Sequence, residues 1–367
     1  MNTSLTALAR PVTAAVRAGY AWSVRREKPE AWLEVARMTG VIMRHLGPGS
    51  APVTPSELVA LLHQPLGVWL SGADPVLGEL VILDEHDRLT DDTYGIACDY
   101  TTEVLAGQED PGARWLPKWR THRAEQVEQE AFQRLVSGSD EDYSVGRRFL
   151  VEHPAGASDD LLDRQTDLGL RPLVSYEPIP QHRQEAGRWW ACPVCHWPMA
   201  ISPSGHVTCR FRPHRATYTL TDGLRILPAD GAPPAPRAQS ANGAVCVDES
   251  IWRFVVVPGV VEIRLHDRLD RLPGVSAALY PGKDRFDVGV RRAGEDDWLV
   301  TLDVKDFSSP AALAAKVTDR PIAAGVLVVP DYRRDQLAQL KRLLPGMDIA
   351  TESQIYRRTS RLSREEQ

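Results

Sequence analysis

The chain has 367 residues, 43% of them hydrophobic and 25% charged, which is an ordinary composition for a globular protein of two or three domains. Its formal net charge of −6 argues against a protein that coats nucleic acid through overall charge, but it does not exclude an enzyme with a local basic surface. No run approaches the roughly 18 uninterrupted apolar residues of a membrane span.

The N-terminus and the cysteines indicate a cytoplasmic protein. The first residues lack the charged and apolar segments of a secretion signal. Three of the five cysteines are clustered at metal-ligand spacing, and this pattern fits a reducing compartment better than a disulfide framework.

Residues 1–180 are predicted to be mostly helical. Apolar residues recur at three- and four-residue spacing over residues 5–16, 31–36 and 55–62, which is typical of packed amphipathic helices. Thr54 is a suitable N-cap for the third segment. We expect a helical scaffold or interaction module.

The pattern becomes mixed after residue 70. Residues 78–83 are predicted to form a strand and residues 123–135 a polar helix. The acidic runs at 84–87 and 139–142 lie in loop-like sequence without a partner motif, so we interpret them as surface acids rather than a metal site.

A cysteine–histidine pattern within residues 181–228 predicts a zinc ribbon. Cys192 and Cys195 form a Cys-x-x-Cys turn, and Cys209 and His214 follow across a predicted two-stranded hairpin. These four ligands suit tetrahedral Zn²⁺, and because they leave no open coordination position the site would be structural. His206 is an alternative fourth ligand, but it falls in the strand that leads to Cys209. The extra Cys and His argue against the rival interpretation, a redox Cys-x-x-Cys.

The residues around the ribbon leave its role open. Arg210, Arg212 and Arg215 flank the second ligand pair, with Phe211 and Trp197 nearby. Basic and aromatic side chains in this setting could contact nucleic acid. The ribbon could equally staple a small subdomain or bind a protein partner.

Residues 229–244 are rich in proline, alanine and small polar residues, a composition that favours extended backbone over a packed core. We therefore predict a linker and a domain boundary here, with residues 245–367 folding as their own unit.

The elements predicted for residues 245–367 alternate between helix and strand. A helical stretch at 250–269, interrupted at Pro258 and Gly259, precedes strands at 275–280, 286–290 and 298–305. A helix capped by Ser309 covers 310–317, and a continuous apolar run at 323–329 predicts a buried strand. A helix at 334–344 and a strand at 347–350 complete this domain.

Two acids and a lysine on the predicted strands form a candidate active site. Asp303 and Lys305 are two residues apart on one strand, so both side chains project to the same face, and Asp287 lies on the preceding strand. Two carboxylates can hold a hard divalent cation, and a nearby lysine can position water or offset charge on phosphate. The alternative is a buried structural ion pair, with neighbouring Asp306 as a surface acid.

The order helix, three strands, helix, strand over residues 250–350 resembles the restriction-endonuclease-like core of the PD-(D/E)xK superfamily. The resemblance implies that Asp287, Asp303 and Lys305 form the active site, with both acids as magnesium ligands. It also matches Glu262, on the preceding helix, to the helix acid of the superfamily. Phe286 replaces the proline of the motif, which makes the match less specific.

The wider arrangement of helical region, Cys-x-x-Cys ribbon and nuclease core resembles the restriction-endonuclease-like proteins encoded beside prokaryotic Piwi-type (pPIWI-RE) proteins and a helicase. This resemblance implies defence against foreign nucleic acid, with a Piwi-type protein and a helicase as partners.

Together these features predict an α+β multidomain protein with a helical N-terminal region, a zinc ribbon and a C-terminal α/β core. The expected activity is a Mg²⁺- or Mn²⁺-dependent endonuclease that hydrolyses phosphodiester bonds of DNA. The alternative is a non-catalytic adaptor that binds nucleic acid or protein through the ribbon and a degenerate nuclease fold. A zinc-ribbon transcription regulator is less well supported, since no helix-turn-helix stands out.

Overall fold

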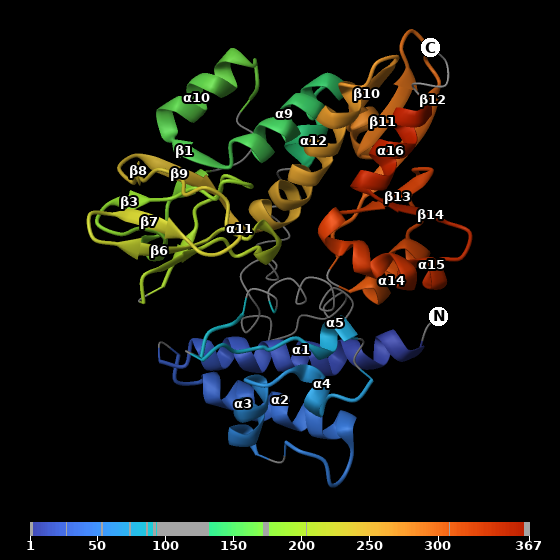
Figure 1. The fold of residues 1–367 in the computed structure, drawn as a ribbon. Helices are drawn as coiled ribbons and strands as arrows, with labels where there is room; N and C mark the ends of the chain where they lie inside the picture. The colour runs from blue at the N-terminus through green and yellow to red at the C-terminus, as the bar shows by residue number, and fades with distance from the viewer. Residues whose placement is uncertain are drawn as a thin grey trace. The chain divides into compact units, whose positions relative to one another are not determined.

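The computed structural model describes residues 3–362 except residues 27, 53, 73, 74, 86, 91, 92, 94–131, 172–175, 203 and 308. The chain divides into unit 1, of residues 1–124 with 307–321, and unit 2, of residues 125–306 with 322–367 (Figure 1). The first part of the helix predicted at 123–135 and one cysteine, Cys98, lie outside the described residues. Of the helices described, none combines the length and apolar character needed to cross a membrane.

Unit 1 contains five N-terminal helices that share one apolar core: α1 (Thr3–Ser23), α2 (Ala31–Leu46), α3 (Pro55–Leu62), α4 (Leu66–Trp69) and α5 (Pro75–Gly78). α14 (Pro310–Asp319), which was predicted to belong to the C-terminal domain, also falls in this unit. α1, α2 and α3 confirm the predicted helical segments, and their buried residues include Val16, Val35, Ile42 and Leu58. Thr54 caps α3 as predicted, through a reciprocal pair of hydrogen bonds with Glu57.

The strand predicted at residues 78–83 is wrong. This stretch makes isolated bridges from Val81 to Pro65 and from Leu83 to Leu89. Its backbone instead bonds to the end of α3, where the Ile82 N–H donates to the Leu62 carbonyl over 3.1 Å. The apolar side chains that suggested a strand fill the core of unit 1 from an irregular segment.

The first half of unit 2 consists of two helices and short antiparallel sheets. α9 (Asp140–Glu152) and α10 (Ser158–Asp167) accompany a sheet of β1 (Ala155–Ala157), β9 (Ala244–Val247) and β2 (Tyr176–Pro178). β3 (Arg188–Trp189) pairs with β8 (Gln239–Ser240). β4 (Ala200–Ile201), β5 (His206–Thr208), β6 (Thr217–Thr221) and β7 (Arg225–Pro228) form the ribbon sheet.

The predicted linker at 229–244 lies inside unit 2 and does not separate the two compact units. It contains β8, and Ala244 begins β9, the central strand between β1 and β2. The Tyr218 hydroxyl also donates to the Pro233 carbonyl over 3.1 Å. Proline-rich composition predicted the extended backbone here, but that backbone is held by strand pairing and side-chain contacts.

The C-terminal half of unit 2 is a five-stranded mixed sheet in the order β10-β11-β12-β13-β14. β10 (Val275–Leu279), β11 (Val288–Arg292) and β12 (Trp298–Val304) are antiparallel, whereas β13 (Val326–Val329) and β14 (Asp348–Thr351) continue in parallel. α15 (Leu337–Leu343) follows η6 (Asp331–Gln336). The last helix described is α16 (Glu352–Leu362), which was not predicted from the sequence.

The helix that precedes this sheet is continuous, so the predicted interruption at Pro258 and Gly259 is wrong. α11 (Glu249–Ile251), the π-helical turn η5 (Trp252–Val256) and α12 (Val257–Asp270) follow one another without a break. Proline fits because it lies in the first turn of α12, directly after the wider π turn. Val261, Leu265 and Leu269 of α12 pack on the core face of the sheet.

Candidate active site and metal centre

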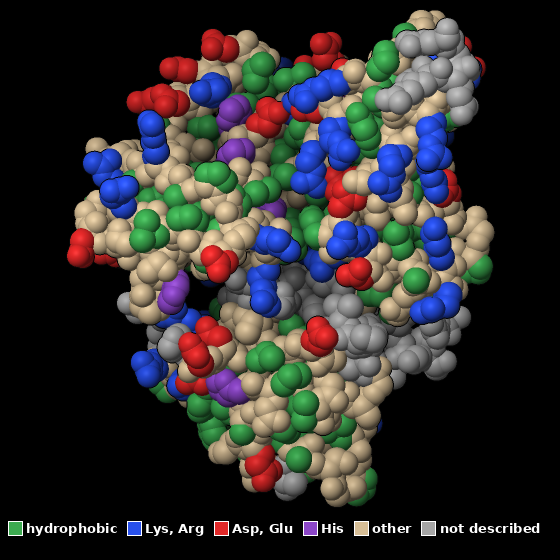
Figure 2. Space-filling view, in the orientation of Figure 1, with side chains coloured by type: hydrophobic (Ala, Val, Ile, Leu, Met, Phe, Trp, Pro, Cys, Tyr) green, Lys and Arg blue, Asp and Glu red, His purple; other side chains and the backbone are tan. Residues whose placement is uncertain are grey.

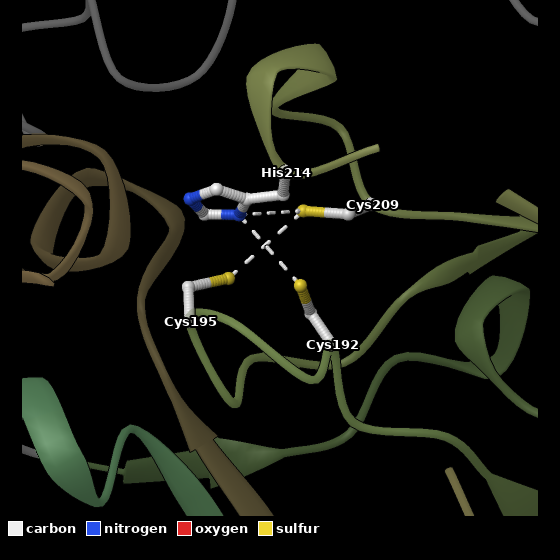
Figure 3. Close-up of side chains that lie close together, drawn as sticks. All are labelled: Cys192, Cys195, Cys209 and His214. Atoms are coloured by element: carbon white, nitrogen blue, oxygen red, sulfur yellow. Dashed lines mark hydrogen bonds between the residues drawn. The ribbon is translucent and has the colours of Figure 1, made fainter. Parts of the chain in front are cut away.

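Four ligand side chains gather where the zinc ribbon was predicted (Figure 3). Cys192 and Cys195 lie on the turn after β3, Cys209 follows β5, and His214 ends the short helix η4 (Arg212–His214). Their ligand atoms all lie within 4.8 Å of one another, and all four residues are buried. Among the residues that the structure describes, this is the only group of three or more such ligands.

The spacing of this Cys3His group fits a tetrahedral metal. His214 Nδ1 lies 3.6 Å from Cys192 Sγ and 3.4 Å from Cys209 Sγ, and the Cys195 and Cys209 sulfurs are 3.9 Å apart. Zn–S bonds of about 2.3 Å and Zn–N bonds of about 2.0 Å require edges of roughly 3.5–3.8 Å. The residues present can therefore hold a metal such as zinc.

His214 rather than His206 completes the group. His206 is exposed on β5, and its Nδ1 contacts Ser204 Oγ at 3.0 Å. The geometry therefore favours His214 over His206 as the fourth ligand.

Hydrogen bonds and burial act differently on the three thiols. Trp252 Nε1 donates to Cys195 Sγ over 3.3 Å, and the Val194 N–H donates to Cys192 Sγ over 3.4 Å. Hydrogen bonds from the neighbouring thiols hold the pKa of Cys192 far below its usual range, whereas burial raises the pKa of Cys195 and Cys209. A bound cation would favour the thiolate at all three positions.

The aromatic side chains around the ribbon point into the protein. Trp197 stacks on Trp252 with ring centroids 4.5 Å apart, and the Arg183 guanidinium lies 4.0 Å from the Trp197 ring centroid. Trp197 and Phe211 are both buried, so neither offers an open platform to a base. This packing favours a ribbon that stabilises its own subdomain over one that contacts nucleic acid, although Arg212 and Arg215 are exposed.

The two strand acids and the lysine come together at one end of the neighbouring strands β11 and β12. Val288 pairs with Leu302, and one further step of this antiparallel register places Asp287 opposite Asp303. The Val304 N–H donates to Asp287 Oδ2 over 2.6 Å. Both acids are buried, with residue exposures of 4% for Asp287 and 8% for Asp303.

Lys305 spans these two carboxylates. Its ammonium donates to Asp303 Oδ1 and lies 3.9 Å from Asp287 Oδ2. The side chains of Asp303 and Lys305 therefore share one face, as predicted from their spacing. Burial alone would lower the pKa of Lys305, but the charges of Asp287 and Asp303 raise it well above its ordinary value. Burial, and then the charge of Glu262, raise the pKa of Asp287.

Glu262 of α12 is buried beside this pair. The Tyr280 hydroxyl donates to Glu262 Oε2 over 2.7 Å, and Arg147 Nη2 donates to the same oxygen over 3.0 Å. Burial raises the pKa of Glu262, and the charge of Arg147 opposes that rise. The positive charge of Lys305 opposes the rise in the pKa of both Glu262 and Asp287, so the three groups share one electrostatic environment.

Sequence reasoning missed two members of this cluster and misjudged a neighbour. Arg147 lies far from the acid–lysine motif along the chain, whereas Tyr280 is close to Asp287, but no local pattern marks either residue. Asp306, predicted as a surface acid, has a side chain only 2% exposed that pairs with Arg333 at 3.0 Å. Its predicted exposure is wrong because η6 covers the end of the strand.

Two stretches of the chain match known family models. Residues 7–157 match the family described as pPIWI_RE three-gene island domain Y, and residues 259–367 match REase associating with pPIWI_RE. No curated protein and no solved structure matched the chain. The chain thus carries a restriction-endonuclease-like domain, and both stretches are of kinds associated with pPIWI-RE systems.

Proposed function

We propose that this restriction-endonuclease-like domain is a metal-dependent nuclease of the PD-(D/E)xK type that hydrolyses phosphodiester bonds of DNA. The observation that carries the proposal is the single ammonium of Lys305 between the buried carboxylates of Asp287 and Asp303. Buried acids and a half-buried lysine are costly unless they are paired or serve a site. The cluster lies in the stretch that matches the restriction-endonuclease family.

The residues fit a divalent cation because they offer hard oxygen donors on rigid strands. Asp287 and Asp303 would hold Mg²⁺ or Mn²⁺, which lowers the pKa of a bound water and polarises phosphate. The Lys305 ammonium now occupies the space between the two carboxylates, and on metal binding it would turn to orient water or offset charge on phosphate. Glu262 would complete the acidic side of the site. The Cys3His group would hold a structural Zn²⁺.

The biological setting is inferred from the two matched families. Both family descriptions name pPIWI-RE, so a Piwi-type protein is the expected partner. We further infer defence against foreign nucleic acid in the cytoplasm, together with a helicase, from the resemblance given above.

The test is cleavage of DNA by the full chain with Mg²⁺ or Mn²⁺. Asp303→Asn and Lys305→Met should each lower the cleavage rate by about 10²-fold or more, the usual cost of removing one group that stabilises charge in the reaction. The exposed residues Asp297 and Lys341 provide matched controls, and Asp297→Asn and Lys341→Met should cleave like the parent protein. Cleavage that persists in both site variants would exclude this assignment.

A non-catalytic adaptor is the second candidate, and one observation favours it. Every acid of the cluster already has an internal cation, Lys305 for the strand acids and Arg147 for Glu262. Such a network can serve structure alone. DNA binding that survives Asp303→Asn, with no cleavage under any divalent metal, would support the adaptor.

A further inference from the structure

We propose that Arg147 of α9 is a positioning residue of the proposed nuclease site. Arg147 holds Glu262 in place, although it lies outside residues 259–367, the stretch that matches the restriction-endonuclease family. The inference rests on the proposed function, because it assigns Arg147 a role in presenting an acid to a metal. It follows that the site is assembled from both family-matched stretches, since Arg147 lies within residues 7–157 and Glu262 within residues 259–367.

The contacts of Arg147 converge on the site. Its guanidinium is buried between α9 and α12, with Nη2 at 3.0 Å from Oε2 and 3.3 Å from Oε1 of Glu262. Nη1 pairs with Asp284 and donates to the Tyr143 hydroxyl over 3.1 Å. The guanidinium carbon also lies 4.1 Å from the Tyr280 ring centroid. One side chain thus contacts the helix acid and two residues of the connection between β10 and β11.

The connection between β10 and β11 has an unusual backbone, and contacts from α9 and the residues just before it fix this backbone in place. Tyr280, Lys283 and Asp284 have φ values of 53°, 53° and 74°, in a region that residues other than glycine rarely adopt. Such strain persists only where surrounding contacts over-determine it, and it is concentrated at functional sites.

Two further hydrogen bonds hold this connection. Ser144 Oγ of α9 donates to the Leu279 carbonyl over 2.8 Å. Lys283 Nζ donates to the Val136 carbonyl, just before α9, over 2.9 Å. The segment that ends at Asp287 is therefore fixed from the α9 side and not by its own strands alone.

These contacts set the orientation of Glu262. Its Oε2 accepts from both Tyr280 and Arg147, whereas Oε1 has only the longer Arg147 contact. Oε2 is therefore held more firmly than Oε1, which leaves Oε1 as the better placed metal ligand. Residues that orient a metal ligand in this way commonly change metal affinity by about 10–100-fold when removed.

A purely structural ion pair would show the same contacts, so the test must measure metal affinity. We would measure Mn²⁺ binding to the zinc-loaded full chain by electron paramagnetic resonance, with Asp303→Asn locating the bound ion. Arg147→Met should weaken Mn²⁺ binding by about tenfold or more. Arg148→Met is the matched control, because Arg148 joins the same two helices through Asp267 at 3.0 Å, away from Glu262.

Arg147 and Glu262 should be coupled in their effects on Mn²⁺ affinity. If Arg147 acts through Glu262, Arg147→Met should have little further effect on Mn²⁺ affinity in a Glu262→Gln background. Tyr280→Phe, which removes only the hydroxyl that bonds Glu262, should also weaken Mn²⁺ binding and serves if Arg147→Met fails to fold. Equal affinities for Arg147→Met and Arg148→Met, an undiminished effect in the Glu262→Gln background, or no Mn²⁺ binding by the parent chain would each overturn it.

The two proposals can fail separately. Mn²⁺ binding that depends on Arg147 in a protein that cuts no DNA would reject the nuclease and keep the positioning role. DNA cleavage and Mn²⁺ binding that are both insensitive to Arg147→Met would do the reverse.

Discussion

His206 and His214 differ in their surroundings, and this difference makes a prediction at the residue scale. His214 is buried within 3.6 Å of two thiol sulfurs, whereas His206 is exposed. His214→Asn should release bound zinc at lower chelator concentration than the parent protein, because it removes one of four ligands. Competition with a chromophoric chelator measures this, and His206→Asn should behave like the parent. Equal zinc retention in the two variants would contradict the ligand set.

The site residues that could be predicted from the sequence are those whose geometry is local. A Cys-x-x-Cys turn brings two thiols together within four residues, and an alternating strand places Asp303 and Lys305 on one face. Arg147 could not be predicted, since its contact with Glu262 spans 115 residues and depends on how α9 packs on α12. Burial of Asp306 likewise depends on a partner, Arg333, that lies in a later element.

The packing of α9 on α12 gives a prediction at the scale of elements. Gly259 of α12 approaches α9 so closely that an added Cβ would lie 2.3 Å from Val151 Cγ2 and 3.4 Å from Val151 Cβ. Val151 has one strongly preferred rotamer in a helix, so it cannot easily move aside. Gly259→Ala should therefore lower the free energy of unfolding of unit 2 by about 1–3 kcal/mol, as measured by urea denaturation.

Two further variants identify the cause of that loss. In a Val151→Ala background the cost of Gly259→Ala should shrink, because the clashing methyl groups are gone. Gly40 of α2 has no atom within 4 Å of an added Cβ, so Gly40→Ala should stabilise unit 1 by about 0.5–1 kcal/mol. Destabilisation by both glycine substitutions would point to a general effect of alanine rather than to the contact with Val151.

Among the elements, the amphipathic helices and the apolar strands could be predicted from their periodicity, while the connections between them could not. Pro258 suggested a break, but the π-helical turn before it accommodates a residue without an N–H. α16 was missed because its sequence is mostly polar, with Ile355 among the few apolar residues that it buries against the sheet.

At the scale of the whole molecule, composition identified the extended segment at 229–244 but placed a boundary where the fold has none. Strand β8 in that segment pairs with β3 in the ribbon, and β9 immediately after it joins β1 and β2. These pairings link residues far apart in the sequence, which composition cannot reveal. The ribbon and the restriction-endonuclease-like core, apart from residues 307–321, therefore belong to one compact unit. Basic side chains are frequent over the C-terminal elements on the face shown in Figure 2.

This shared unit predicts that removing a metal bound by the Cys3His group will disturb the helix formed by α11, η5 and α12. Trp252, in the turn before α12, donates to the ligand Cys195 and stacks on Trp197, and Glu249 of α11 pairs with Arg210 beside Cys209. Chelation should therefore lower the hydrogen-exchange protection of amides in residues 249–270, whereas amides of α1–α3 in unit 1 should keep theirs. Re-addition of Zn²⁺ should restore the protection. If chelation left residues 249–270 protected while exposing the ribbon alone, the metal would support only its own loops and not the helix that carries Glu262.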